Sequence, residues 1–345
     1  MRKIFLAIAV LVVVNYASAQ DPHFSQFFSS PLTLNPAFTG KFDGQFRFAG
    51  NFRNQWVSIP NAYKTVSGSV DFGILKDNIH KGDILGIGFS GVSDQSGDGA
   101  LSLNYGSASV AYHKALDEDG YSTLGLGFQA TYSSLTVDLN KLVFEDFLTN
   151  GFTEETNPTI GPGNPGAPGG TLANGRSNSY LDMNAGLLYS GSNNGDNNYY
   201  FGISFYHINS PAVGFKDTNW KLSPRTTAHA GGTFPLGEQL SISTSIIEQL
   251  QDQANETVGG AALCFNANDA SDDPTNVYIG SWYRLGDAII PYVGLEFSGL
   301  RLGASYDINT SSLKAATEER GGTEFSVIYI TKNPDGNTGI PCPKF

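Results

Sequence analysis

The stretch FRFAGNFRNQW, residues 46–56, is the clearest indication of the fold class of this chain. Side chains of a β-strand point alternately to its two faces, so apolar and polar residues that alternate with period two predict a strand with one face of each kind. The apolar face carries Phe46, Phe48, Phe52 and Trp56, and the polar face carries Arg47, Asn51, Arg53 and Gln55. We expect the apolar face to point outward and the polar face inward.

The same alternation recurs along the chain, between clusters of Gly, Asn, Asp and Pro that are typical of turns. In residues 65–74, Val66 and Val70 alternate with Ser67 and Asp71. The further predicted strands are 83–92, 100–113, 121–135, 179–190, 198–208, 225–234, 239–249, 257–266, 276–285, 288–298, 299–308 and 323–331. With the first two, this gives about fourteen antiparallel strands, and an even number is typical of closed single-chain outer-membrane barrels.

The composition indicates a membrane rather than an aqueous environment for this sheet. Only 15% of the residues are charged, against ~25% in soluble domains, whereas 12% are aromatic and 41 are Gly. Beyond the N-terminus, no apolar run approaches the ~20 residues of a membrane helix. The net charge of −12 argues against nucleic acid as a partner. We therefore predict an all-β chain whose strands cross a lipid bilayer as an outer-membrane barrel.

The N-terminus has the features of a secretory signal peptide. Arg2 and Lys3 precede an apolar run over residues 4–14, and small residues at 17–19 predict cleavage between Ala19 and Gln20. The predicted division is then signal peptide 1–19, periplasmic N-terminal segment or plug 20–43, barrel 44–331 and periplasmic tail 332–345. Both termini are expected in the periplasm of a Gram-negative bacterium, with compact periplasmic turns and longer outward connections such as 136–178.

Several blocks of the sequence carry a more specific pattern. They are DPHFSQF (21–27), LNPAFTG (34–40), FRNQW (52–56), HIN (207–209), LSPR (222–225), SYDINTS (305–311) and CPKF (342–345). Together these blocks resemble the PorP/SprF family of the type IX secretion system, over nearly the whole chain after residue 19. Lys344 departs from the pattern, because Arg is expected there more often.

The resemblance implies a non-catalytic outer-membrane protein that helps one large secreted protein to cross the outer membrane or to stay attached at the cell surface. Such partners are typically adhesins with a C-terminal sorting domain, and gliding motility is one setting in which they act. Other outer-membrane or periplasmic components of the secretion system are expected partners too. The alternative is a passive porin-like channel for small solutes, and a lipid hydrolase is a third hypothesis.

The candidate functional residues lie in the two most specific blocks. We expect Asn35, Pro36, Phe38, Arg53, Asn54 and Trp56 to contact a partner or to form a plug, with a purely structural latch as the alternative. Cations in predicted strands could point into the lumen, where they would either pair with acidic residues or select solutes. The cations are Arg47, Arg53, Arg284 and Arg301, and the acidic candidates are Asp71, Asp182 and Glu296.

Motifs that could carry chemistry favour structural interpretations, and we predict no catalytic, cofactor-binding or metal-binding residues. The G-x-G-x-x-G pattern at 86–91 lies in a predicted strand and opens no helix, so a dinucleotide has no helix N-terminus to bind. The five histidines are scattered, and Asp269, Asp272 and Asp273 lack the spacing of an EF-hand. No G-x-S-x-G elbow nominates a nucleophile. Cys264 and Cys342 could form a disulfide, and the sequence alone does not say whether they pair.

Overall fold

The alternating stretch forms strand β1 (Phe46–Gln55) in the computed structural model of this chain. The structure describes residues 21–56, 63–75, 80, 82–97, 100–118, 120–138, 179–193, 197–213, 220–268, 275–312 and 314–331. Several expectations lie outside these residues: the signal peptide 1–19 with cleavage between Ala19 and Gln20, most of the connection 136–178, the acidic turn at 269–273, the tail 332–345 and the pairing of Cys342.

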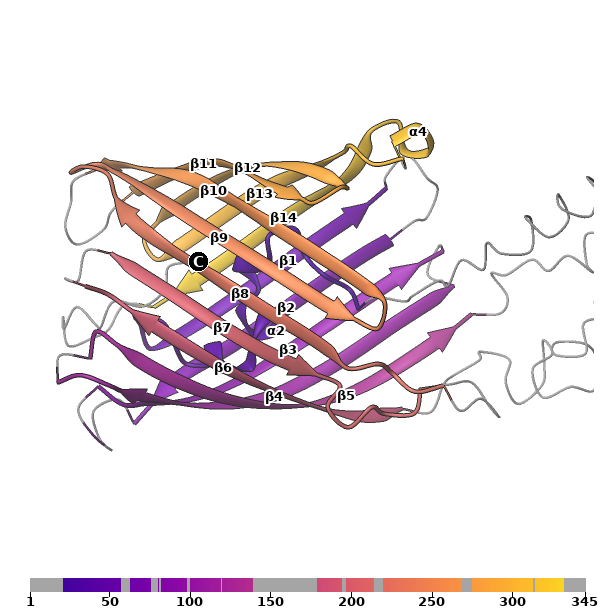
Figure 1. The fold of residues 1–345 in the computed structure, drawn as a ribbon, viewed down its shortest axis with the longest axis horizontal. Helices are drawn as coiled ribbons and strands as arrows, with labels where there is room; N and C mark the ends of the chain where they lie inside the picture. The colour runs from indigo at the N-terminus through magenta and orange to yellow at the C-terminus, as the bar shows by residue number, and fades with distance from the viewer. Residues whose placement is uncertain are drawn as a thin grey trace, which may run out of the picture.

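Fourteen antiparallel strands close into one barrel, in which each strand pairs with its neighbours in sequence and β14 pairs with β1 (Figure 1). This confirms the predicted all-β outer-membrane barrel and its strand number. After β1 the strands are β2 (Tyr63–Ile74), β3 (Ile84–Ser96), β4 (Leu101–Ala115), β5 (Thr123–Val137), β6 (Tyr180–Gly191), β7 (Asn198–Tyr206), β8 (Arg225–Pro235), β9 (Leu240–Gln251), β10 (Ala254–Asn268), β11 (Thr275–Arg284), β12 (Ala288–Phe297), β13 (Leu300–Asn309) and β14 (Arg320–Ile330).

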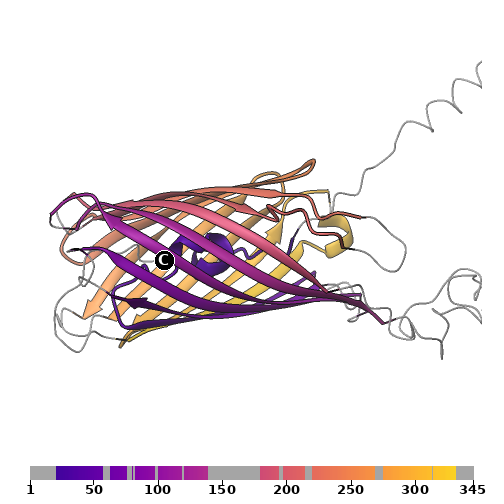
Figure 2. The ribbon, with the colours of Figure 1, turned by 90° about the horizontal axis from the view of Figure 1, so that it is seen from below.

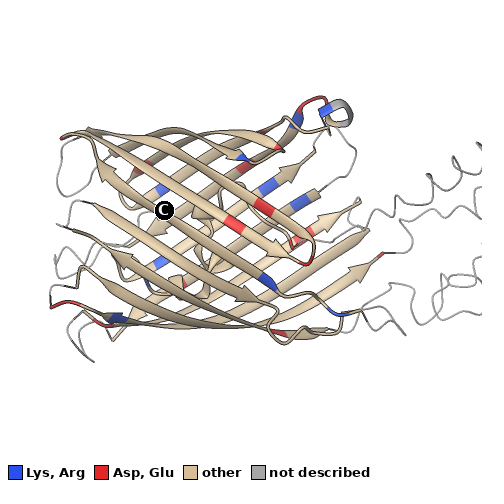
Figure 3. Ribbon diagram, in the orientation of Figure 1, with Lys and Arg blue, Asp and Glu red and all other residues tan. Residues whose placement is uncertain are grey.

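The two faces of the wall follow the predicted alternation. Phe48 is 43% exposed on the outer face, whereas its neighbour Arg47 is 2% exposed on the inner face. The outer face is apolar because lipid solvates it, and the few charged residues of the strands stand out against an otherwise uncharged ribbon (Figure 3). Trp56 departs from the prediction. The strand ends at Gln55, Trp56 adopts a left-handed backbone (φ 57°), and its side chain lines an internal cavity.

The lumen contains the first described residues of the chain, 21–45, which we call the luminal segment (Figure 2). It forms three short helical turns, η1 (Phe27–Ser29), α2 (Pro31–Leu34) and η2 (Pro36–Phe38). The short helix α4 (Lys314–Thr317) marks the end of the barrel where β1 finishes, here called the α4 end. The segment begins at this end, since Asp21 contacts Arg225 and Gln251, and it leaves at the other end into β1.

Of the two predicted alternatives for residues 20–43, this path corresponds to the plug, with Asp21 at the α4 end of the lumen. The connections alternate less in length than expected. At the α4 end, β5 and β6 are joined by residues 138–179, but β9 and β10 only by residues 252–253. Among the described residues, no helix is long and apolar enough to span a membrane.

Candidate functional site

The NPAF block of the luminal segment packs against the inner wall. Asn35 is fully buried, and its amide nitrogen lies 3.0 Å from the carbonyl oxygen of Leu187 and 3.0 Å from Nε2 of His229. Its side-chain oxygen accepts a hydrogen bond from the backbone N–H of Ala37, which caps η2. The Phe38 ring packs against Tyr200, with ring centroids 5.7 Å apart. These signature side chains therefore hold the segment to the barrel wall.

Glycines of the wall make room for this block. A Cβ atom added at Gly127 would lie 2.3 Å from the nitrogen of Ala37, and one at Gly186 would lie 1.8 Å from the side chain of Asn35. The same holds for Gly86, where an added Cβ would lie 2.1 Å from the carbonyl oxygen of Thr39. Gly86 opens the G-x-G-x-x-G pattern, which lies within β3 and permits close packing rather than forming a phosphate-binding turn.

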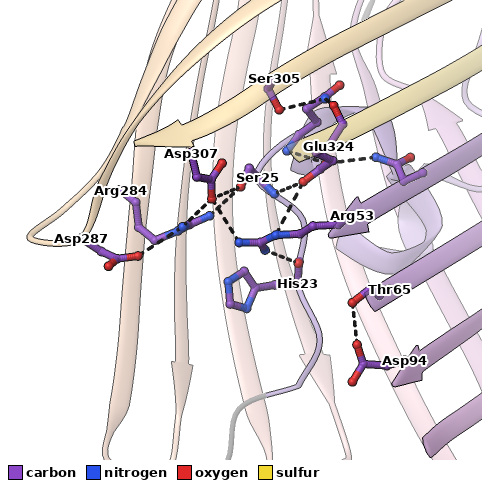
Figure 4. Close-up of polar contacts among 12 residues, drawn as sticks. His23, Ser25, Arg53, Thr65, Asp94, Arg284, Asp287, Ser305, Asp307 and Glu324 are labelled. Carbon is purple, nitrogen blue, oxygen red and sulfur yellow. Dashed lines mark hydrogen bonds and ion pairs between the residues drawn. The ribbon is translucent and has the colours of Figure 1, made fainter. Parts of the chain in front are cut away.

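The DPHFSQF block is held by buried charges (Figure 4). The Glu324 carboxylate on β14 accepts hydrogen bonds from the backbone N–H groups of Ser25 and Gln26, at 2.7 and 2.9 Å. Arg53 on β1 donates to the carbonyl oxygen of His23 at 2.6 Å and to Asp307 at 3.1 Å. Both charged side chains are almost completely buried, so they bind the backbone of the segment without competition from water.

A second arginine extends this network along the wall. Arg284 on β11 donates to the Ser25 hydroxyl at 2.7 Å and pairs with Asp307 at 2.9 Å, with Asp287 at 3.3 Å and with Glu256 at 3.1 Å. Three carboxylates thus surround one guanidinium. Since these partners come from β10, β13 and the β11–β12 turn, the network joins neighbouring strands of one side of the wall to the segment.

Of the three acidic residues expected in the lumen, two pair with one of the predicted arginines. Arg47 pairs with Asp71 at 2.9 Å and also donates to the carbonyl oxygen of Phe38, and Arg301 pairs with Glu296. Asp182 is different, because its partner is His207 at 2.9 Å and not an arginine. His207 follows the end of β7, and β6 brings Asp182 beside it.

The tip of the luminal segment is bound at the α4 end of the lumen. The Asp21 carboxylate lies 3.1 Å from Arg225 and 2.6 Å from Nε2 of His207. Burial alone would raise the pKa of Asp21, but Arg225 and His207 hold it well below its usual range. Burial likewise opposes protonation of His207, yet hydrogen bonds and charges from Asp182 and Asp21 raise its pKa to about 9. At neutral pH this contact is an ion pair.

A cavity of about 790 Å³ lies beside this tip, in the lumen at the α4 end. Asp21, Pro22, His23, Leu32 and Thr33 of the luminal segment contribute to its lining, as do residues of the surrounding wall. Aromatic and acidic side chains are prominent among the wall residues: Trp56, Tyr63, Tyr105, Tyr180, Tyr206, Trp220, Asp94, Asp182 and Glu256. The volume falls within the ~300–1,000 Å³ of typical ligand pockets.

The structure thus divides the candidate residues. Asn35, Pro36, Phe38 and Arg53 are buried at contacts between the luminal segment and the wall, and Trp56 lines the cavity. Asn54 is separate from both groups, because it lies on the outer face of β1 between Lys64 and Thr323. Sequence reasoning missed Glu324 and Asp307. Their signal was one acidic residue at an inward position of a strand that contains a single other charged residue, Arg320 in β14 and Arg301 in β13.

The family follows from comparison with known sequences. The profile described as "Type IX secretion system membrane protein PorP/SprF" matches residues 17–329. The chain belongs to the PorP/SprF family. This confirms the resemblance and makes the protein an outer-membrane component of type IX secretion, a family of secretion proteins rather than of enzymes. Comparison with curated protein sequences finds no significant match.

Solved structures with the same architecture are outer-membrane barrels of low sequence identity to this PorP/SprF protein. The Pseudomonas putida toluene transporter TodX matches with a TM-score of 0.52 and 11% identity, covering 87% of this chain and 92% of TodX. The Ralstonia pickettii toluene transporter TbuX matches with a TM-score of 0.44 and 11% identity, covering 87% of this chain and 92% of TbuX. At this identity the likeness to TodX concerns the fold alone.

Proposed function

We propose that this protein is a partner for the secretion or surface anchoring of one large secreted protein, such as an adhesin with a C-terminal sorting domain. The observation that carries this choice is the filled lumen. Buried residues of the luminal segment occupy the centre of the barrel and are held by Glu324, Arg53 and Asp71, so a solute would have to displace them. A protein whose task is binding has no need of an open pore.

The proposed orientation places Phe46 and Ile330 at the periplasmic end, which puts the α4 end at the cell surface. The cavity and the tip of the luminal segment would then face the secreted protein. Asn35, Pro36 and Phe38 would act as plug contacts in this arrangement, because they bind the wall. The residues available to a partner are those of the cavity, Trp56 among them.

The test is affinity purification of the tagged protein from its native outer membrane in mild detergent, with mass spectrometry of the proteins that accompany it. We expect one large surface protein with a C-terminal sorting domain. Isolation of the barrel alone would contradict the proposal.

The second candidate is a passive channel, which the fold shared with TodX brings into consideration. Conductance of the purified protein in planar bilayers separates the two functions. We expect the complete chain to conduct far less than a variant that lacks residues 22–42. Equal and steady conductance of both proteins would favour the channel.

A further inference from the structure

One acidic side chain in the cavity differs from the other four that line it. Asp21, Asp182, Glu256 and Asp287 each have a cationic partner within 3.3 Å, supplied by Arg225, His207 or Arg284. Among the described residues Asp94 makes no ion pair, and its carboxylate accepts a hydrogen bond from the Thr65 hydroxyl at 2.5 Å (Figure 4). A carboxylate has about four lone-pair sites, so Asp94 retains capacity for another donor.

Aromatic rings lie on both sides of this carboxylate. Asp94 is opposite Thr65 on β2 and opposite Leu103 on β4. Tyr63 lies two residues before Thr65 and Tyr105 two residues after Leu103, at diagonal positions that long side chains can reach, and all three residues line the cavity. Trp56 extends the aromatic wall, with its ring centroid 5.2 Å from that of Tyr63.

We propose that Asp94, Tyr63 and Tyr105 form a binding site for a cationic side chain, a lysine or arginine, presented by an extended segment of the secreted partner. The carboxylate supplies the opposite charge, and the faces of the rings attract a cation through their negative quadrupole. This inference rests on the proposed function, because the cavity faces the partner only in that role. The net charge of −12 favours a cationic ligand further.

The direct test measures how much surface protein is recovered with tagged Asp94→Asn from native outer membrane. Asparagine can still accept the Thr65 hydrogen bond, so we expect normal barrel assembly but about tenfold less recovered partner, the usual scale for loss of a charged hydrogen bond. Asp94→Glu should retain part of the recovery. Glu319→Gln is the matched control, because it removes one exposed negative charge at the α4 end outside the cavity lining.

The source of the cation is identified by carbodiimide coupling, which joins a carboxylate to a neighbouring lysine, followed by mass spectrometry. A link between Asp94 and a lysine of the surface protein supports the proposal. A link only to a lysine of this chain overturns it, as does equal recovery of partner with Asp94→Asn and wild type. In that last case the proposed function still stands. Failure of the wild type to recover any surface protein would overturn both.

Discussion

At the scale of single residues, the strongest effects are expected at the buried charges of the lumen. Asp71 is fully buried and accepts hydrogen bonds from Arg47 and from the backbone N–H of Gly40. Asp71→Asn would leave the Arg47 guanidinium buried without its carboxylate, at a cost of about 3–5 kcal/mol. Thermal unfolding in detergent should show a clear loss of stability. Glu318→Gln, in an exposed pair with Arg320 at 3.8 Å, should change nothing measurable.

His207 gives a second prediction at this scale, on pH. Its pKa in the folded protein is about 9, above the ~6.5 of an unfolded histidine. The stabilisation is therefore complete below pH ~6.5 and is lost as the pH rises through 9. We expect the stability difference between wild type and His207→Gln to shrink from pH 6 to pH 10. A difference that stays constant over this range would contradict the ion pair with Asp21 and Asp182.

At the scale of elements, strands β1 to β14 are largely predictable and the luminal segment is not. Alternation over about ten residues, as in 46–55, predicts a strand, because local sequence determines which residues lie on each of its faces. Residues 21–45 have no such period. Their short turns are stabilised by contacts with strands far along the chain, for example between Gln26 and Ser305. Sequence could nominate this segment as a plug but could not give its path.

The packing between segment and wall yields a prediction for these elements. Gly127→Val would force side-chain atoms against the backbone at Ala37, so the strand can form but the luminal segment must shift. Limited proteolysis or hydrogen exchange should show weaker protection of residues 34–40. Gly68→Val is the control, because no atom lies within 4 Å of a Cβ added there. Equal protection in both variants would show that the segment does not need the space at Gly127.

At the scale of the whole molecule, the barrel depends on the pairing of its first and last strands. Val327 on β14 lies opposite Gly50 on β1 and opposite Leu302 on β13. Val327→Pro removes one backbone donor from this closure, and lipid offers no replacement hydrogen bond. We expect much less assembled barrel in the outer membrane, measured by the heat-dependent mobility of the folded form. Val327→Ala, which keeps the N–H group, should assemble nearly normally.

The strands, their number and the inward or outward face of most strand residues can be predicted from local sequence, because these depend on neighbouring residues and on the contrast between lipid and lumen. Which residues occupy the lumen, and which charges meet there, follows from the folded barrel alone. Arg53 and Asp307 are separated by 254 positions, and Ser25 and Glu324 by 299. Such pairs form because closure brings β14 beside β1, and the register of that closure is a property of the complete barrel.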